Sequence, residues 1–348
     1  MKMKHLASAF ATAIVLCLWT TTFAQKDFTN NATMRIGWWN VENYFNPQDD
    51  SIKNDEAFTP EGSNHWSYKR FYLKRDNIYK TIVALGQGEP PAFMGFCEVE
   101  DEWVMRQLCF NTPLRKYHYQ YIHYESPDRR GIDNAFIYRP DRFTPIYSKT
   151  ISAAKPDDSA FFTRDILLVS GVTFQGDTLF VFVNHFPSKL GGDVAEVRRN
   201  YVAALLKKSI DTVMLHHPKS GVIVMGDFND SPFADCIVKH LGIGPEKSDW
   251  ENNSMINLVA DKPAGTGSYK YQADWSCIDQ IMVSKNMILE SDFPLYVKDQ
   301  TAVIFDADFL LIDDPKFLGK KIFRTYIGGR YQGGFSDHLP LYIDLIRK

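Results

Sequence analysis

The stretch Gly221-Val-Ile-Val-Met-Gly-Asp-Phe-Asn-Asp230 decides the fold of this 348-residue chain. Its apolar run, residues 222–225, is mostly β-branched, too short for a helix and bounded by glycines, which is typical of a strand buried on both faces. Gly226 then lets the backbone turn, and Asp227 and Asn229 follow. The pattern predicts a rigid core strand that presents a carboxylate and an amide at its end. The alternative is an ordinary turn, because Asp, Asn and Gly are common turn residues.

The rest of the chain shows more strand patterns than helix patterns, and several strands are joined as hairpins. Apolar residues near helical spacing predict helices at residues 68–85, 101–110 and 196–215. No linker of biased composition divides the chain, so we expect one α/β domain of two stacked mixed sheets with helices outside. Strands are predicted at residues 34–39, 92–97, 117–124, 134–138, 166–174, 178–183, 222–225, 268–271, 278–283 and 339–346, whereas residues 292–326 fit no pattern.

The first residues have the plan of a secretory signal peptide. Lys2 and Lys4 precede an apolar run at residues 7–19, and small residues lead to Ala24. The apolar run is too short for a comfortable membrane span, so no transmembrane segment is expected. We therefore expect residues 1–24 to be removed and residues 25–348 to form a monomer that is periplasmic or secreted.

Charge and cysteine content limit the classes of partner. Removal of residues 1–24 leaves 37 of the 39 basic residues against 42 acidic ones, a net charge of about −5, and no basic run stands out. A nonspecific duplex binder usually has a basic face. Four cysteines remain without a Cys-x-x-Cys motif or a Cys/His cluster, so a zinc site is not predicted, and two disulfides would have three possible pairings; these cysteines are Cys97, Cys109, Cys236 and Cys277.

Polar residues recur where the predicted strands end. Each alone is a weak signal, because asparagines often cap turns and a lone histidine is more often structural. Glu98 and Asp279 are stronger signals, since a carboxylate at or inside a buried strand needs a partner. The full set is Asn40, Glu42, Glu98, Asn184, His185, Asp227, Asn229, Asp279, Asp337 and His338.

The chemistry of this set suits magnesium-assisted hydrolysis of a phosphate ester. It combines hard oxygen ligands, two histidines and several amides, and the chain has no Gly-x-Ser-x-Gly nucleophile motif. A cation of this kind neutralises phosphate charge while a base activates water. Asparagine amides and an imidazolium can stabilise the charge that develops on the phosphorane.

Six motifs occur in the order seen in the endonuclease/exonuclease/phosphatase superfamily, which the chain resembles from Arg35 to the C-terminal strand. The superfamily includes pancreatic deoxyribonuclease, apurinic endonucleases, bacterial sphingomyelinases and inositol polyphosphate phosphatases. The resemblance implies a four-layered α/β sandwich, in which two mixed, mostly antiparallel sheets pack together with helices outside and the site at one edge. The motifs are Trp39-Asn-Val-Glu42, Gly95-Phe-Cys-Glu98-Val-Glu100, Asn184-His185, Gly226-Asp-Phe-Asn229, Ile278-Asp279 and Ser336-Asp-His338-Leu-Pro340.

The resemblance also implies a metal site. Glu98 is similar to the principal metal ligand of the superfamily, and Asn40 and Glu42 lie beside it as ligands, directly or through water. Asp337 completes this acidic side. Mg²⁺ is the expected ion, with Mn²⁺ or Ca²⁺ as alternatives.

Catalytic roles follow from the same resemblance. His338, oriented by Asp279, would be the general base or would polarise the phosphate. Asp227 and Asn229 would position or activate water and hold a phosphoryl oxygen, so the choice of base between His338 and Asp227 stays open. His185 resembles the second histidine of the deoxyribonuclease and sphingomyelinase branches and is the candidate general acid.

The motifs indicate hydrolysis of a phosphate ester but do not identify the substrate. Asn184 and Arg130 are the expected substrate contacts, although Arg130 also fits a solvated turn. The segment Asn184-His185-Phe-Pro-Ser-Lys189, followed by two glycines, is similar to one in secreted bacterial nucleases, so we expect a nuclease whose partner is nucleic acid. The alternatives are a sphingomyelinase-like enzyme, a small-molecule (inositol) phosphoesterase with residues 292–326 as the pocket wall, and an inactive binding protein of the same fold.

Overall fold

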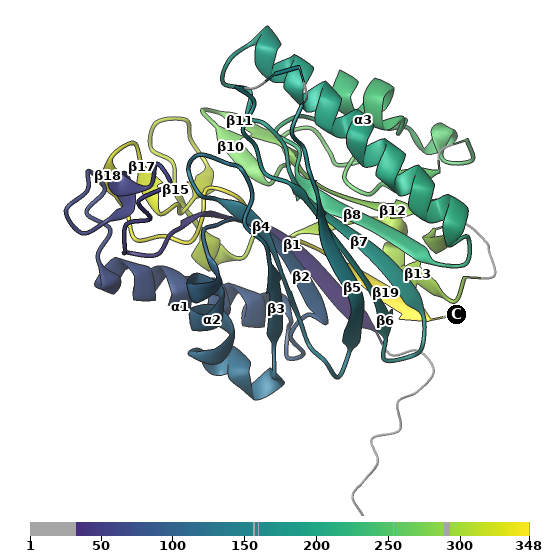
Figure 1. Cartoon of the computed structure of the whole chain (residues 1–348), viewed down its shortest axis with the longest axis horizontal. Helices are drawn as coiled ribbons and strands as arrows, with labels where there is room; N and C mark the ends of the chain where they lie inside the picture. Colours follow the sequence, from purple (N-terminus) through teal and green to yellow (C-terminus); the bar gives the residue numbers. More distant parts are fainter. Residues whose placement is uncertain (1–32, 156, 159, 253, 289–292, 348) are drawn as a thin grey trace, which may run out of the picture.

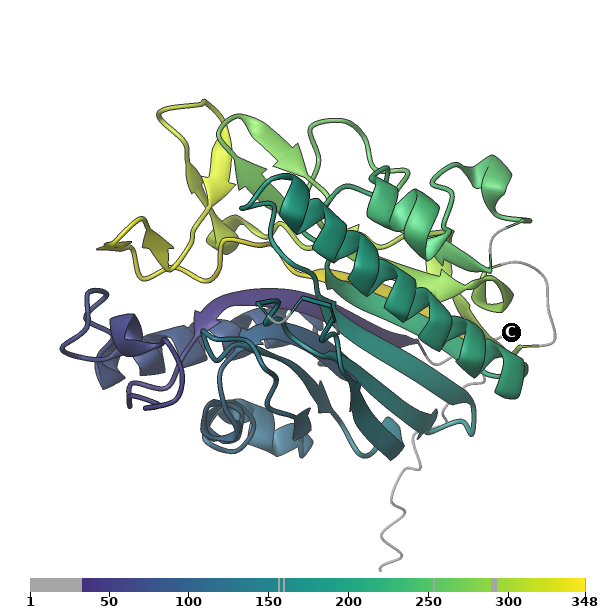
Figure 2. The same cartoon turned by 45° about the horizontal axis from the view of Figure 1, so that its top comes forward.

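The structure is a computed structural model that describes residues 33–155, 157–158, 160–252, 254–288 and 293–347. The predicted signal peptide, residues 1–24, lies outside the described residues. In the described part of the chain, two large sheets stack face to face and helices cover both outer faces (Figures 1 and 2). The predicted four-layered α/β sandwich of two mixed, mostly antiparallel sheets is thereby confirmed.

The first sheet has seven strands in the order β13-β19-β1-β2-β4-β3, and β14 also pairs with β19. β1 and β2 are parallel, and the other pairs in this sheet are antiparallel. The strands are β1 (Met34–Tyr44), β2 (Phe93–Val99), β3 (Gln120–His123), β4 (Asp133–Tyr138), β13 (Leu295–Val297), β14 (Val303–Ile304) and β19 (Leu341–Arg347).

The second sheet has six strands in the order β5-β6-β7-β8-β12-β9. Here β7 and β8 are the parallel pair, and the others are antiparallel. The opening stretch forms β8, which is buried along its whole length as its sequence predicts. The strands are β5 (Phe143–Ile151), β6 (Ile166–Thr173), β7 (Thr178–His185), β8 (Gly221–Asp227), β9 (Met255–Asn257) and β12 (Asp279–Ser284).

Three helices cover the outer faces. α1 (Tyr68–Leu85) and α2 (Glu102–Phe110) pack on the first sheet, and α3 (Asp193–His216) packs on the second. Alternation along β1 shows the layering, because Trp38 lies in the core between the sheets and Trp39 in the core beneath the helices. Short helical segments are η1 (Glu56–Phe58), η2 (Pro113–Tyr117), η3 (Cys236–Leu241), η4 (Lys247–Asp249), η5 (Lys285–Met287), η6 (Lys298–Gln300) and η7 (Asp308–Leu310).

Three small hairpins gather beyond one end of the sandwich (Figure 1). The stretch that fits no sequence pattern supplies one of them, β15 with β16, and Leu310, Ile322 and Leu339 form a small core there. Their strands are β10 (Tyr269–Tyr271) with β11 (Asp274–Ser276), β15 (Leu311–Asp313) with β16 (Lys320–Ile322), and β17 (Tyr326–Ile327) with β18 (Arg330–Tyr331).

Several details differ from the sequence-based expectation. β5 was not predicted; its exposed and half-buried residues lie on the edge of the sheet, so they carry no apolar alternation. β1 runs five residues past its predicted end, through Asn40 and Glu42. All four described cysteines are free thiols. No described helix is long and apolar enough to cross a bilayer.

Candidate active site

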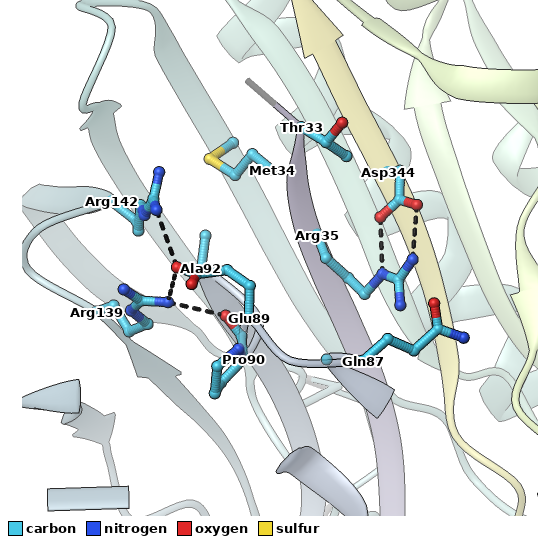
Figure 3. A pocket seen from close by; sticks show the side chains of 11 residues that line it. Thr33, Met34, Arg35, Gln87, Glu89, Pro90, Ala92, Arg139, Arg142 and Asp344 are labelled. Atoms are coloured by element: carbon cyan, nitrogen blue, oxygen red, sulfur yellow. Dashed lines mark hydrogen bonds and ion pairs between the residues drawn. The ribbon is translucent and has the colours of Figure 1, made fainter. Parts of the chain in front are cut away.

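A pocket of about 220 Å³ lies where β1 and β2 begin, lined by Arg35, Glu89, Arg139, Arg142 and Asp344 among others (Figure 3). Its guanidinium groups are paired with carboxylates. Arg35 binds Asp344 through two hydrogen bonds of 2.7 and 2.8 Å, and Arg139 and Arg142 donate to Glu89 at 2.6 and 2.9 Å. None of the predicted site residues lines this pocket. They lie at the opposite edge, where the parallel strands end.

Strand register explains why these residues meet. In the second sheet, His185 at the end of β7 lies opposite Asp227 at the end of β8, and Asp227 lies opposite Asp279 at the start of β12. In the first sheet, β1 and β2 are parallel, so Asn40 and Glu98 also reach one edge. Because the two sheets stack, both sets of strand ends face one another.

Left-handed backbone conformations aim several of these side chains. Glu42, Asn43, Glu98 and Asn229 have positive φ angles of 49°, 53°, 61° and 51°. The register of β1 shifts between Asn40 and Tyr44, and that of β2 shifts around Glu98, as in β-bulges. The shifts break the strand alternation and turn Asn43 and Glu98 toward each other, with Asn43 N donating to Glu98 Oε2 at 2.9 Å. Such angles are uncommon outside glycine and occur often at functional sites.

A histidine–aspartate pair forms one side of the site. His338 Nδ1 lies 2.6 Å from Asp279 Oδ2, and both side chains are buried. Asp279 also accepts hydrogen bonds from Trp38 Nε1 at 2.9 Å and from Ser268 Oγ at 2.5 Å. The ring of Tyr269 packs against the imidazole, with centroids 4.9 Å apart. These contacts fix the imidazole so that Nε2 is the atom left to face the site.

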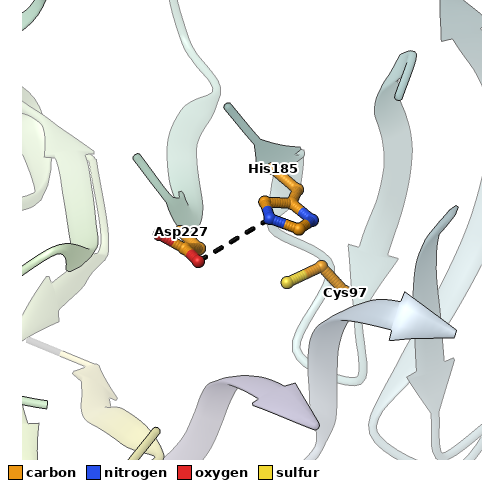
Figure 4. A group of neighbouring side chains, drawn as sticks. All are labelled: Cys97, His185 and Asp227. Carbon is orange, nitrogen blue, oxygen red and sulfur yellow. Dashed lines mark ion pairs between the residues drawn. The ribbon is translucent and has the colours of Figure 1, made fainter. Parts of the chain in front are cut away.

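Asp227 is the carboxylate between the two histidines. Its Oδ2 lies 3.7 Å from His185 Nε2 and 3.9 Å from His338 Nε2. Asn40 Nδ2 donates to the same oxygen at 3.1 Å and to Glu98 Oε1 at 3.3 Å, which links the two sheets. Figure 4 shows His185 directed at Asp227, with the buried thiol of Cys97 beside them.

Burial and neighbouring charges give the three groups different pKa values. Burial lowers the pKa of His185 well below its usual value, and the charges of Arg164 and Arg130 lower it further. Burial also acts to lower the pKa of His338, but Asp279 and Asp337 outweigh it and raise that pKa well above its usual value. Burial raises the pKa of Asp227 to about 7. In the free protein, therefore, His338 is the cationic histidine and His185 the neutral one.

The acidic side contains Glu42, Glu98 and Asp337. Glu42 accepts from the backbone N–H groups of Thr325 and Tyr326 at 2.6 and 3.1 Å, so its carboxylate is anchored to the C-terminal loops. Burial, followed by the charge of Asp337, raises the pKa of Glu42 to about 7. Glu98 and Asp337 are the more open carboxylates, with 15% and 18% of their side chains exposed.

The donor set fits a divalent cation. Carboxylate and amide oxygens are the ligands that Mg²⁺ prefers in proteins. Glu98 and Asp337 offer the more open carboxylate oxygens, whereas Asn40 turns its Nδ2 toward Glu98 and its Oδ1 accepts from Glu42 N. Five carboxylates gather at the site, and a bound cation would offset their mutual repulsion; they are Glu42, Glu98, Asp227, Asp279 and Asp337.

Three predicted site residues make their main contacts with the protein backbone or a loop carboxylate rather than with the catalytic groups. Asn184 is fully buried; its amide donates to the backbone oxygens of Phe182 and Met225 at 3.3 and 3.2 Å, so it contacts its own sheet. Asn229 donates through its side chain to the backbone oxygen of Phe186 at 3.0 Å. Arg130 is half exposed, with Nε 3.7 Å from Asp128. The substrate-binding roles of Asn184 and Arg130 stay predictions.

Sequence reasoning missed three basic residues at the site. Arg324 Nη2 lies 2.6 Å from Asp337 Oδ2 and Nε 3.8 Å from Glu42 Oε1. It belongs to the stretch that fits no pattern, so no sequence signal marked it. Lys74 is fully buried on α1 and donates to Thr325 Oγ1 and the backbone oxygen of Phe335 at 2.6 Å each.

Arg164 is the third of these residues. It is buried beside the site and donates to Asp128 at 3.1 Å and to the backbone oxygen of Phe186 at 2.8 Å. The sequence gives no signal that Arg164 is buried, because its carboxylate partner, Asp128, lies in a distant loop whose position the sequence does not predict.

Glu100 shares the Glu98 motif but lies outside the site. It accepts a hydrogen bond from Asn46 N, and burial, with Asp101 and Asp55 nearby, raises its pKa to about 10 from 4.5. Because the folded pKa exceeds the unfolded one, this group's contribution to stability is full below about pH 4.5 and is lost as pH rises toward 10.

Glu100→Gln is therefore expected to increase the free energy of unfolding, by at least about 1 kcal/mol at pH 8 and by less at pH 5. Urea unfolding of both proteins at the two pH values measures the change. An equal effect at both values would show that Glu100 is already ionised in the folded protein.

Comparisons with known proteins show the family and the fold of the chain. The sequence model of the Endonuclease/Exonuclease/phosphatase family matches residues 35–347. A solved protein of this family from Bacteroides thetaiotaomicron has a TM-score of 0.57 at 14% identity, over 91% of this chain and 99% of that chain. A mannosyl-6-phosphatase from the same organism has a TM-score of 0.56 at 15% identity, over 90% and 99%.

A third solved structure is TDP2 from D. rerio in complex with a single-strand DNA product. It has a TM-score of 0.53 at 16% identity, over 90% of this chain and 99% of that chain. No curated protein sequence matches the chain. At these identities, the solved structures establish the fold and leave the substrate to be argued from the site.

Proposed function

Because the chain belongs to the endonuclease/exonuclease/phosphatase family, we propose that it is a metal-dependent hydrolase of phosphodiester bonds, with nucleic acid as its substrate. The observation that carries the proposal is the meeting of two unlike groups at one edge of the sandwich. The Asp279–His338 pair lies on one side of Asp227, and Asn40 joins Asp227 to Glu98 on the other. Anionic phosphate and a water nucleophile need both a cationic and a basic surface.

Glu98 and Asp337 are the residues proposed to hold the cation, with Asn40 and Glu42 supporting them directly or through water. Mg²⁺ is the proposed ion, and Mn²⁺ or Ca²⁺ would suit the same oxygens. A bound divalent cation supplies neutralisation of the phosphate charge.

The chain's own residues supply the proton chemistry. His338 donates from Nε2 to a phosphoryl oxygen, because Asp279 occupies Nδ1. Asp227 orients the attacking water and accepts its proton, since its Oδ2 faces both histidines within 4 Å. Attack on phosphorus then breaks the bond to the leaving oxygen. Protonation of that oxygen by His185 stays a prediction, because the lowered pKa of His185 makes it neutral in the free protein.

Three features support nucleic acid as the substrate. The segment that follows His185 is similar to one in secreted bacterial nucleases. Arg130 is half exposed, and its charge reaches His185. The fold is shared with a protein solved with a single-strand DNA product. Export of the enzyme, as the N-terminal sequence predicts, would suit a nuclease that scavenges nucleotides.

A small phosphorylated sugar is the second candidate substrate. Tyr269 packs against His338, and Arg324 pairs with Asp337, so both side chains border the catalytic groups on that side. Side chains this close to the catalytic groups would contact a compact substrate. The fold is also shared with a mannosyl-6-phosphatase.

A substrate panel tests the proposal. The mature protein would be assayed with Mg²⁺ and with EDTA on plasmid DNA, RNA, bis(p-nitrophenyl) phosphate, sphingomyelin, inositol phosphates and mannose 6-phosphate. We expect nicking of the plasmid that EDTA abolishes. Release of inorganic phosphate from the sugar or inositol phosphates alone would favour the second candidate. Absence of hydrolysis on every substrate, with metal bound, would favour an inactive binding protein.

A further inference from the structure

A second group of metal-ligand side chains lies on the β3–β4 edge of the first sheet. His123 is the last residue of β3, Asp133 is the first residue of β4, and Glu125 lies in the loop between them. One ligand atom from each of the three lies within 4.8 Å of the other two. None of the three belongs to the catalytic motifs.

Two of these ligand atoms are buried and lack hydrogen-bond partners. Among the described residues, His123 Nε2 and Asp133 Oδ2 have none, although their side chains are only 4% and 1% exposed. An unpaired polar atom in such a place is costly. The other oxygen of Asp133 accepts from Ser126 Oγ, which holds the carboxylate in its orientation toward His123.

The spacing of the two atoms fits a shared cation better than a hydrogen bond. His123 Nε2 and Asp133 Oδ2 are 3.5 Å apart, whereas the catalytic pair, His338 and Asp279, is 2.6 Å apart. Nitrogen and oxygen ligands at about 2.1 Å from a tetrahedral Zn²⁺ stand about 3.4 Å from each other. The observed separation therefore matches one edge of such a coordination sphere.

We propose that His123, Asp133 and Glu125 form a binding site for a divalent transition metal such as Zn²⁺. An imidazole with two carboxylates selects this class over Mg²⁺ or Ca²⁺, which take oxygen ligands. Lys53 lies 3.2 Å from Glu125 Oε2 and neutralises it in the metal-free protein. Glu125 is the exposed ligand, with 57% of its side chain accessible, so it can turn from the lysine to the metal.

A metal here would brace the loop beside the catalytic site. Residues 124–132 connect the two strands and carry Asp128, which binds Arg164, and Arg130. Asp133 also pairs with Val99, the residue after Glu98, at the bulge of β2. The ion would therefore fix both ends of the loop and the strand that flanks Glu98. Its role would be structural rather than catalytic.

Calorimetric titration of the metal-free mature protein with Zn²⁺ tests the site. Glu98→Gln serves as the background, because it weakens cation binding at the catalytic site. We expect one equivalent of Zn²⁺ to bind and to raise the thermal unfolding temperature. Binding of Co²⁺ at the same site should give the visible absorption of a tetrahedral complex.

Variants assign the signal to the three residues. His123→Ala should weaken Zn²⁺ binding by at least about tenfold, and so should Glu125→Gln, an exposed change that leaves the fold intact. His240→Ala, an exposed histidine on another surface, is the matched control and should bind as the parent does. Equal Zn²⁺ binding in Glu125→Gln, His123→Ala and the control, or no binding in the parent, would overturn the proposal.

Discussion

Replacing His338 with alanine is expected to lower kcat for phosphodiester hydrolysis by about 1,000-fold or more. The imidazole is the cationic donor held by Asp279, and alanine has no hydrogen-bonding group to replace it. The fold should survive, because Asp279 keeps hydrogen bonds from Trp38 and Ser268 after the histidine is gone.

Steady-state kinetics on bis(p-nitrophenyl) phosphate, with thermal unfolding of each variant, measure this effect. His216→Ala removes an exposed histidine at the end of α3 and is the matched control, expected to retain wild-type rates. Wild-type turnover in a folded His338→Ala protein would exclude the proposed mechanism.

Glu98→Gln is expected to lower kcat/KM by at least about 100-fold and to raise the Mg²⁺ concentration needed for half-maximal activity. The change removes a negative charge from the open side of the site. It keeps one acceptor oxygen, so one of the two hydrogen bonds from Asn40 Nδ2 and Asn43 N can persist.

Titration of activity with Mg²⁺, together with Mn²⁺ binding followed by electron paramagnetic resonance, tests this expectation. Glu100→Gln is the control, since it makes the same chemical change two residues away and outside the site. That variant should keep both the activity and the metal requirement. An unaltered metal requirement in Glu98→Gln would place the cation elsewhere.

The sandwich and most of its site could be predicted because their signals are local. The run that forms β8 is apolar and ends at Gly226 and Asp227, so neighbouring residues predict both the burial of the strand and its end. The helix α1 begins and ends at the residues predicted from its apolar spacing. The polar residues of the motifs lie at strand ends, and the order of the motifs resembles that of a known family. This was enough to predict that four residues meet: His185, Asp227, Asp279 and His338.

The rest depends on contacts between distant segments. The anchoring of Glu42 by backbone groups of residues 325 and 326, and the pairing of Arg324 with Asp337, need loops that show no periodicity. The pairing of His123 with Asp133 depends on the register between β3 and β4. The irregular loop between these strands gives no sequence signal from which that register could be predicted. Sequence patterns predict which residues are buried and which face of a strand or helix they occupy. They do not predict which distant residues a loop brings into contact.

The left-handed glutamates of the site place the stability of this edge in opposition to its acidic geometry. Glutamate is not a residue that favours positive φ, and each such position costs about 1 kcal/mol or more, yet Glu42 and Glu98 both adopt it. Glycine at either position would relieve the backbone strain, but it would also remove a carboxylate from the acidic side of the site. The same two residues therefore carry both a local conformational cost and the negative charge that suits a cation.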